Sequence, residues 1–202
     1  MPRNRFIEPS APVLRREPPS GREWLHEIKH DGWRAQLHLD AGRARIYSKR
    51  GADLTCRFRS IADAVARLPA SSLILDAELI ACDVNGQPSF GALMSGAPHG
   101  CCAYVFDLMH DDDGAHLAAP LEYRRHLLRK LLKRARIDAL RFSDAFDDPQ
   151  ALLAACAKYG LEGIVSKLRE DRYRSGTNRG WIKVKTAEWR AANRQRWELF
   201  QR

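Results

Sequence analysis

Several features that would place this chain in other protein classes are missing from its 202 residues. No apolar run is long enough to cross a membrane, and no basic start followed by an apolar stretch indicates a signal peptide. The five cysteines include no C-x-x-C pair, although Cys101 and Cys102 are adjacent. An odd number of cysteines without zinc-site spacing favours reduced thiols over disulfides or a zinc site. We therefore expect a cytoplasmic protein with no membrane partner.

The common phosphate-binding and hydrolase motifs are missing too. There is no G-x-x-x-x-G-K-[ST] loop and no G-x-G-x-x-G turn, so side chains must hold any phosphate in place of a glycine-rich loop. There is also no G-x-S-x-G elbow and no H-E-x-x-H helix. The motifs of P-loop enzymes, dinucleotide-binding folds, serine hydrolases and zinc peptidases are thus excluded.

What the chain does have is positive charge and enough apolar residues for a core. The formal net charge is +9, and hydrophobic residues make up 45% of the sequence. A field of this sign attracts polyanions, of which nucleic acid is the commonest large one. The length suits one domain with a full core, or a large domain with an appendage.

The hydrophobic pattern predicts short strands with a few helices between them. Residues 1–22 are rich in proline, arginine and serine and predict an extended lead-in. Strands are expected at 23–26, 33–39, 43–48, 72–76, 78–83, 103–109, 163–167 and 181–185. Helices are expected at 60–68, 121–135, from the capping Asp148 to Gly160, and at 187–201. This order predicts an α+β domain with largely antiparallel sheets.

Turn residues predict how the strands connect. Asp31-Gly32 is expected to join the first two strands as a turn, because glycine accepts the positive φ that turns need. Residues 40–42 would join the second strand to the third, which makes the three strands a meander. Residues 85–86, Asn-Gly, predict a further hairpin turn.

Residues 27–34, EIKHDGWR, concentrate charge at a strand end. Lys29 lies among a glutamate, an aspartate and an arginine, which is unusual for a solvated surface and indicates a site. The alternative is a hairpin whose turn happens to be charged.

Charged residues recur at the other strand ends, and these ends could line one cleft. Alternation places Lys183 and Lys185 on one face of a strand together with Trp181. Two neighbouring ammonium groups repel each other unless an anion lies between them, and a phosphate would suit. The alternative for each pair is an ordinary solvated strand face.

Six short motifs follow one another in the order found in covalent nucleotidyltransferases, which include ATP-dependent DNA ligases, RNA ligases and mRNA capping enzymes. Residues 29–34, KHDGWR, resemble the K-x-D-G-x-R motif. The others are SKRG at 48–51, LDAEL at 75–79, YVFDL at 104–108, EGIVSK at 162–167 and WIKVK at 181–185. Ala77 and Arg50 stand where the family usually has glycine and asparagine. The chain is most similar to the ligase domains of bacterial end-joining DNA ligases.

The resemblance implies an α+β nucleotidyltransferase domain, ATP-grasp-like, over residues 23–186. It would consist of two largely antiparallel sheets flanked by helices, with the nucleotide cleft between them. It also implies a DNA ligase that uses ATP and acts on nicked double-stranded DNA in repair, recombination or end joining. Its place would be the bacterial nucleoid.

The resemblance also implies roles in nucleotide chemistry. Lys29 would attack the α-phosphate of ATP and hold AMP as a phosphoramidate. An attacking amine must be neutral, and repulsion from Lys183 and Lys185 would favour that form. These two lysines would also neutralise the α-phosphate charge that grows in the transition state. The nucleotide contacts would come from Glu78 on the ribose, Phe106 stacked on adenine, and the backbone near Glu27 and Ile28 on the base.

Further residues would serve the metal and the DNA. Glu162, with Glu78, would hold a divalent cation, Mg²⁺ or Mn²⁺. Arg34 and Lys49 would hold the ribose or the 5′-phosphate of a nick, and Arg50 would join them in DNA binding. AMP would then pass to the DNA 5′-phosphate, from which the 3′-hydroxyl would displace it.

The chain departs from the family after its last motif. Family ligases continue into an OB-fold, whereas residues 187–202 predict a basic helix. We expect a minimal enzyme, a separate OB-fold or end-joining protein as partner, or the loss of a step. Self-adenylation from ATP is then expected to be slow, and sealing of a pre-adenylated nick is expected to suffer less.

Two alternatives stay open beside the DNA ligase. One is a relative that acts on RNA ends or caps. The other is a non-catalytic remnant that binds DNA ends, against which the intact lysine and both carboxylates argue.

Overall fold

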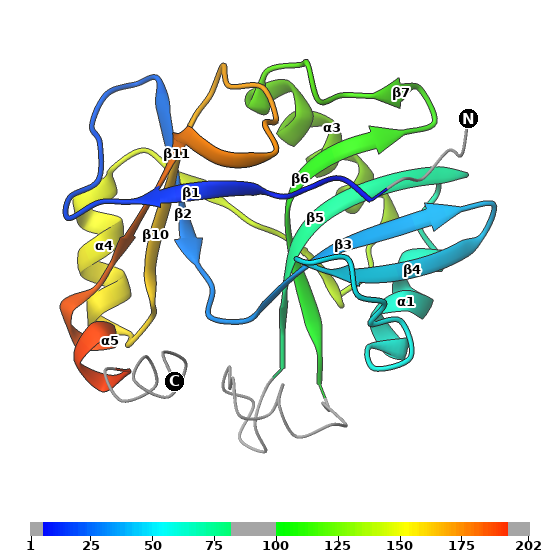
Figure 1. The fold of residues 1–202 in the computed structure, drawn as a ribbon, viewed down its shortest axis with the longest axis horizontal. Coiled ribbons are helices and arrows are strands. Elements are labelled where there is room, and N and C mark those ends of the chain that lie inside the picture. Colours follow the sequence, from blue (N-terminus) through cyan, green and yellow to red (C-terminus); the bar gives the residue numbers. More distant parts are fainter. Residues whose placement is uncertain (1–5, 82–99, 194–202) are drawn as a thin grey trace. The chain divides into compact units, whose positions relative to one another are not determined.

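The fold is α+β, as the sequence predicts, with two sheets and the helices that cover them (Figure 1). The computed structural model describes residues 6–81 and 100–193. These residues form two compact units, each assembled from three segments of the chain. Unit 1 comprises Gly32–Ser143, Glu170–Gly176 and the residues up to Ser10, and unit 2 comprises Ala11–Asp31, Asp144–Arg169 and the residues from Thr177.

The sheet of unit 1 has the strand order β4-β3-β5-β6-β7, and β8 pairs with β6. The pairings are antiparallel except that of β8, which is parallel. A two-residue turn joins β3 to β4, with φ of 47° at Ala41 and 78° at Gly42, as a tight hairpin requires. The strands are β3 (Trp33–Asp40), β4 (Arg43–Ser48), β5 (Ser72–Ile80), β6 (Cys102–Asp111), β7 (Gly114–Ala115) and β8 (Leu140–Phe142).

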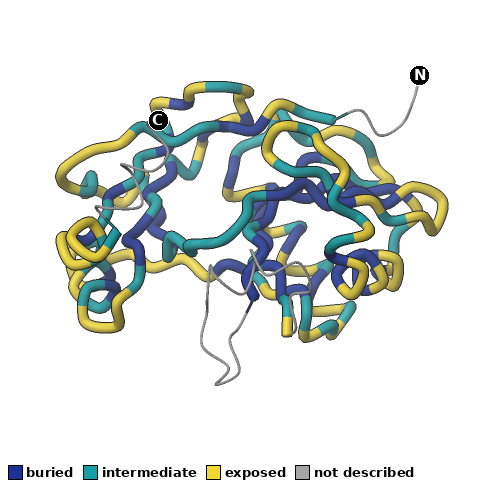
Figure 2. The backbone as a smooth tube through the Cα atoms, turned by 60° about the horizontal axis from the view of Figure 1, so that its bottom comes forward, coloured by how far each residue is buried: buried dark blue, intermediate teal, exposed yellow. Residues whose placement is uncertain are grey.

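One face of this sheet carries the main hydrophobic core. Helices α1 (Arg59–Ala66) and α3 (Leu121–Ala135) supply Ile61, Val65, Leu128 and Leu132 to it. They meet alternate residues of the strands, such as Leu75, and the central stretches of β3 and β5 appear dark blue in Figure 2. Helix α3 occupies its expected range, and α1 begins one residue before and ends two residues before the expected 60–68.

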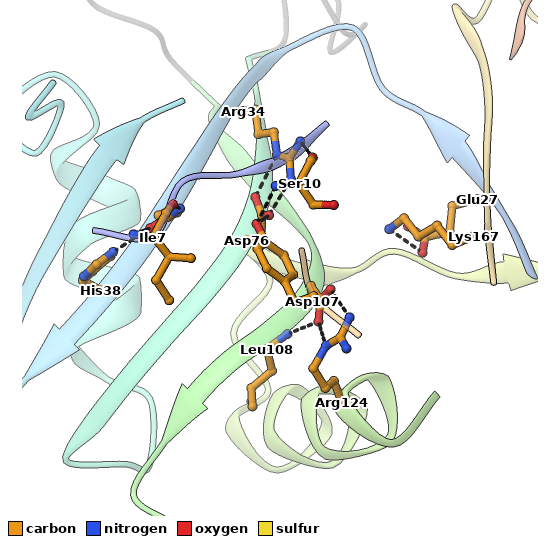
Figure 3. A network of polar contacts seen from close by, with 12 residues as sticks. Ile7, Ser10, Glu27, Arg34, His38, Asp76, Asp107, Leu108, Arg124 and Lys167 are labelled. Carbon is orange, nitrogen blue, oxygen red and sulfur yellow. Dashed lines mark hydrogen bonds and ion pairs between the residues drawn. The ribbon is translucent and has the colours of Figure 1, made fainter. Parts of the chain in front are cut away.

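The opposite face of the unit 1 sheet is polar and holds the N-terminal segment. The Gln36 amide pairs with both backbone groups of Ile7, and its oxygen lies 3.1 Å from Nε2 of His38 (Figure 3). Arg34 donates to the carbonyl of Ser10, whose own N–H donates to the hydroxyl of Tyr173. Residues 7–10 are therefore held by hydrogen bonds that are buried or partly buried.

The sheet of unit 2 has the order β1-β11-β10-β2-β9. Its strands are β1 (Ser10–Leu14), β2 (Trp24–Lys29), β9 (Ala145–Phe146), β10 (Gly163–Leu168) and β11 (Gly176–Lys185). Helix α4 (Pro149–Lys158) packs Leu152 and Cys156 against Ile164 and Val184 on one face. That face is apolar, so the other face is left for polar side chains.

The ends of α4 match their sequence signals. The carboxylate of Asp148 accepts bonds from the N–H groups of Gln150 and Ala151, and Pro149 occupies the first turn. Gly160 follows the helix with φ of 66°. Helix α5 (Ala187–Ala192) begins at Thr186, whose hydroxyl accepts from Trp189.

Two expectations about the first strands are wrong. β2 and β3 do not form a meander, because β2 pairs with β10 and β9 whereas β3 pairs with β4 and β5. Gly32 does not have positive φ. It is needed for close approach: a Cβ there would lie 2.2 Å from the carbonyl oxygen of Leu79.

Other segments either form strands that the sequence did not predict or lie outside the described residues. The lead-in contains β1, a strand that its composition did not predict. Strands β7, β8 and β9 were not predicted either, because two or three residues show no period. The turn at 85–86, the end of the strand at 82–83 and the helix beyond residue 193 lie outside the described residues.

Candidate active site

Lys29 is the last residue of β2, and its ammonium is bound by a buried carboxylate. Nζ lies 2.7 Å from Oε2 of Glu162, and Nζ of Lys185 lies 2.9 Å from the other oxygen, Oε1. The side chain of Lys29 is 23% exposed and that of Glu162 only 4%. One carboxylate therefore separates two lysines and offsets their repulsion, while Lys29 keeps access to solvent.

Strand register explains why these groups meet. Gly163 is the cross-strand partner of Lys29 on one side and of Lys185 on the other. It has no side chain, and a Cβ there would lie 2.0 Å from the carbonyl oxygen of Val184. The carboxylate of Glu162 bridges the two flanking lysines at this position. Glycine is thus required at this position for two reasons: the close approach of the two strands and the backbone φ of 149°.

The same register puts a wider set of charges on one face of the unit 2 sheet. Directly opposed residues share a face, and Val165 is opposed by Glu27 on β2 and by Lys183 on β11. Residues two positions apart also share it. The face opposite the α4 core therefore carries Glu27, Lys29, Lys167, Lys183 and Lys185, and it has an excess of positive charge.

A second ion pair on this face was not predicted. Nζ of Lys167 lies 2.8 Å from Oε1 of Glu27, and each side chain is only 3% exposed (Figure 3). The same ammonium lies 4.4 Å from the centre of the Trp181 ring. The sequence shows both charges, and β alternation could have put them on one face, but only the register makes them neighbours.

The residues beside Lys29 differ in their surroundings. Ile28 packs against the apolar α4 cluster. Its strand neighbour β9 pairs only with His26 and Glu27, so β9 does not cover the backbone of Ile28. Burial lowers the pKa of His30 to about 4, so its imidazole adds no positive charge next to Lys29 near neutral pH.

Arg34 lies in unit 1 and is tightly held. Nε and Nη2 donate to the two oxygens of Asp76 at 3.0 and 2.7 Å (Figure 3). The guanidinium also lies 5.3 Å from the centre of the Phe106 ring. Burial opposes its charge, but Asp76 more than offsets this, so the pKa of Arg34 is raised. Arg34 therefore links Asp76, Phe106 and the carbonyl of Ser10.

The remaining predicted residues of unit 1 lie on or beside the polar face. Oε1 of Glu78 accepts from the N–H of Gly32 at 3.2 Å, which ties the K-x-D-G-x-R segment to β5. Lys49 and Arg50 are exposed in the turn after β4, and the N–H of Lys49 donates to the carbonyl of Arg34. Asp107, buried like Asp76, binds Arg124 through both oxygens at 2.7 and 2.8 Å.

The part of the chain that the structure describes has no group of three or more histidine, cysteine, aspartate or glutamate side chains that could enclose a metal ion. Mg²⁺ needs no such cage, because it is commonly held by one or two carboxylates with water and substrate phosphates. Glu162 in unit 2 and Glu78 in unit 1 are each a carboxylate of the kind that such sites use. Among residues 6–81 and 100–193, no helix is long and apolar enough to span a membrane.

Comparison with known proteins gives consistent matches. The family described as ATP dependent DNA ligase domain matches residues 13–185. The multifunctional non-homologous end joining protein LigD of Pseudomonas aeruginosa is 35% identical over 189 residues, covering 91% of this chain and 22% of that protein. The LigD end joining DNA repair protein of Mycobacterium tuberculosis is 31% identical over 166 residues, covering 81% of this chain and 22% of that protein. The chain thus spans less than a quarter of each relative.

Solved structures agree with the sequence matches. The ligase domain of Mycobacterium tuberculosis LigD superposes with a TM-score of 0.72 at 26% identity. A mycobacterial DNA ligase D complexed with ATP and MES gives 0.70 at 29% identity. Each match covers 87% of this chain and 60% of the other.

Proposed function

The chain belongs to the family of ATP dependent DNA ligase domains, and from this premise we propose that it is the nucleotidyltransferase part of a ligase that seals nicked double-stranded DNA through a lysyl-AMP. The observation that carries the proposal is the arrangement of Lys29 and Lys185 around the Glu162 carboxylate. It combines a partly exposed amine, a carboxylate in hydrogen-bond contact with it, and a second cation. We assign the adenylation domain to residues 23–186, and its DNA substrate places its work at the bacterial nucleoid.

Lys29 is the proposed nucleophile. Its Nζ forms a bond to the α-phosphorus of ATP, and the bond to pyrophosphate breaks. The nitrogen must first lose a proton, and Oε2 of Glu162, 2.7 Å away, is placed to take it. AMP then passes to the 5′-phosphate of the nick, and the 3′-hydroxyl displaces it to leave a continuous strand.

The positive face of the unit 2 sheet stabilises the phosphate. Lys183 and Lys185 lie two residues apart on β11 and share the face of Lys29. Their charges offset the negative charge that develops on the α-phosphate. The Lys167–Glu27 pair beside them supports the shape of this face, and the backbone of Glu27 and Ile28 is proposed to contact the base.

Unit 1 contributes the remaining nucleotide and DNA contacts in this proposal. Glu78 binds the ribose hydroxyls, and Phe106 stacks on adenine while the Arg34 guanidinium, which lies over the same ring, helps to hold it in place. Lys49 and Arg50 are exposed cations for the DNA backbone, and Arg34 is a further contact for the nick or the ribose.

Glu162 and Glu78 are the residues that would hold Mg²⁺ or Mn²⁺, and the ion would supply neutralisation of phosphate charge. An OB-fold or an end-joining protein is the proposed protein partner.

The test of this function is a labelling experiment. The protein is mixed with α-labelled ATP and Mg²⁺, separated on a denaturing gel, and assayed on pre-adenylated nicks in DNA and in RNA. We expect acid-labile label on wild type, none on Lys29→Ala, and normal labelling of Lys133→Ala, an exposed lysine of α3. Absence of both labelling and sealing in wild type would refute the enzyme, and preferential sealing of RNA would indicate an RNA ligase.

A further inference from the structure

A row of polar side chains runs across the sheet of unit 1 at the level of Glu78. Glu78 on β5 is the cross-strand partner of Arg34 on β3 and of Tyr104 on β6. Tyr104 in turn is the partner of Arg141 on β8. Opposed residues share a face of the sheet, so the row extends the face of Glu78 outward by two strands, to Arg141.

Arg141 and Tyr104 form a pair on this face. Nη1 of Arg141 donates to the hydroxyl of Tyr104 at 3.2 Å, and the guanidinium lies 5.7 Å from the centre of the ring. Nε donates to the carbonyl of Asp138 at 3.3 Å. Arg141 is exposed and Tyr104 half-buried. The arginine is therefore a solvent-facing cation whose direction is set by an aromatic ring and a backbone oxygen.

Tyr104 is the direct cross-strand neighbour of Glu78, and Arg141 begins one strand farther out. Neighbouring strands are about 4.8 Å apart, so roughly 10 Å separates the backbones of Arg141 and Glu78. A cation placed beside Glu78 on the same face suits the chain of a nucleic acid, whose charges repeat at about 3.4 Å per strand along the axis.

We infer that Tyr104 and Arg141 form a binding site for the sugar-phosphate backbone of the DNA strand that flanks the reacting ends. This rests on the proposed function. A guanidinium binds phosphate through paired N–H donors, and Arg141 presents this group at an exposed position on the face of Glu78. The tyrosine ring beside it offers a surface on which a sugar or base packs. The pair thus combines the two groups that nucleic-acid surfaces use most.

Helix α3 provides a matched contrast. Lys130, Lys133 and Arg134 are exposed cations on the helix that covers the other face of the same sheet. They have the same charge as Arg141 but are not on the face of Glu78. If net charge alone attracted DNA, removing one of them would weaken binding as much as removing Arg141.

The experiment measures binding of fluorescent nicked duplex by anisotropy over a range of salt concentrations, for wild type, Arg141→Ala, Arg141→Lys and Lys133→Ala. We expect Arg141→Ala to weaken binding about fivefold to tenfold and to reduce the salt slope by about 0.9, the value for one phosphate contact. Arg141→Lys keeps the slope but not the full affinity, because an ammonium lacks the paired donors. Lys133→Ala behaves as wild type.

Sealing of a pre-adenylated nick gives a second measurement. We expect Arg141→Ala to raise KM for the nick more than it lowers kcat, with Tyr104→Phe milder than Tyr104→Ala because the ring remains. Equal losses of DNA affinity in Arg141→Ala and Lys133→Ala would overturn the assignment. The assignment would also be overturned if Lys29 labelling, measured without DNA, fell by as much as the affinity for DNA. The pair would then serve the nucleotide. Failure of the proposed function is distinct: wild type would not be labelled, whatever its affinity for DNA.

Discussion

The ammonium of Lys29 lies 2.7 Å from the carboxylate of Glu162, although 133 residues separate them in the chain. This contact joins the end of β2 to the residue before β10, and the second oxygen of the same carboxylate binds Lys185. Two of the positive charges on this face are thus kept together by one acidic side chain.

Replacing Glu162 by glutamine tests that role. The amide keeps the shape of the side chain but leaves the two lysines without a charge between them and without the acceptor for the proton of Lys29. We expect the rate of Lys29 labelling by α-labelled ATP to fall about a hundredfold or more, the range typical of a lost general base. The exposed Glu170→Gln is the control. A labelling rate within twofold of wild type would remove Glu162 from the reaction.

The buried pair of Lys167 and Glu27 is expected to contribute strongly to the stability of unit 2. Both side chains are 3% exposed, so Lys167→Met removes the cation that a buried carboxylate binds, at a cost of about 3–5 kcal/mol. The double variant Lys167→Met with Glu27→Gln should recover much of that loss. The measurement is chemical denaturation of all variants in a double-mutant cycle, and additive effects of the two changes would contradict the pairing.

Histidine burial predicts loss of stability in acid. Burial of His38 lowers its pKa to about 4, against an ordinary value of 6.5. Below pH 6.5 the unfolded chain takes up a proton that the folded chain does not, so stability falls as the pH drops from 6.5 to 4. The shift corresponds to about 3 kcal/mol at one pKa unit per 1.36 kcal/mol.

Denaturant unfolding at several pH values checks this prediction. His38→Gln should show a shallower pH dependence, while His126→Gln, at an exposed position of α3, should keep the wild-type slope. His30, whose pKa burial also lowers to about 4, accounts for part of the remaining slope. An unchanged slope in His38→Gln would contradict the assignment.

Gly32 is expected to resist substitution because of space and not because of φ. A Cβ would lie 2.2 Å from the carbonyl oxygen of Leu79, which is backbone and cannot turn aside. Gly32→Ala should cost about 1–3 kcal/mol, as overpacking does, and disturb the N–H bond to Glu78. Gly42→Ala meets nothing within 4 Å and should cost only about 1 kcal/mol, the lower end of the cost of a left-handed backbone. Thermal unfolding of both variants measures the two losses of stability. A larger loss for Gly42→Ala than for Gly32→Ala would contradict the prediction.

Local features of the fold were predictable because they depend on neighbouring residues. The period of apolar residues predicted α1 and α3, and the capping pair Asp148-Pro149 predicted the start of α4. The two-residue turn after β3 followed from its glycine. Strands β7, β8 and β9 were missed because two or three residues are too few to show alternation.

The order and spacing of the six motifs were enough to place this chain in its family and to single out Lys29, Glu78, Glu162, Lys183 and Lys185 as candidates. Alternation also put Lys183 and Lys185 on one face. The tertiary structure alone decided which strands are neighbours: β2 and β3 enter different sheets, and β10 brings Glu162 to Lys29 and Lys167 to Glu27. The physical reason is that strand pairing depends on long-range packing: β2, for example, buries Ile28 against the cluster of α4, which is distant in sequence. No local pattern in residues 27–34 contains that information.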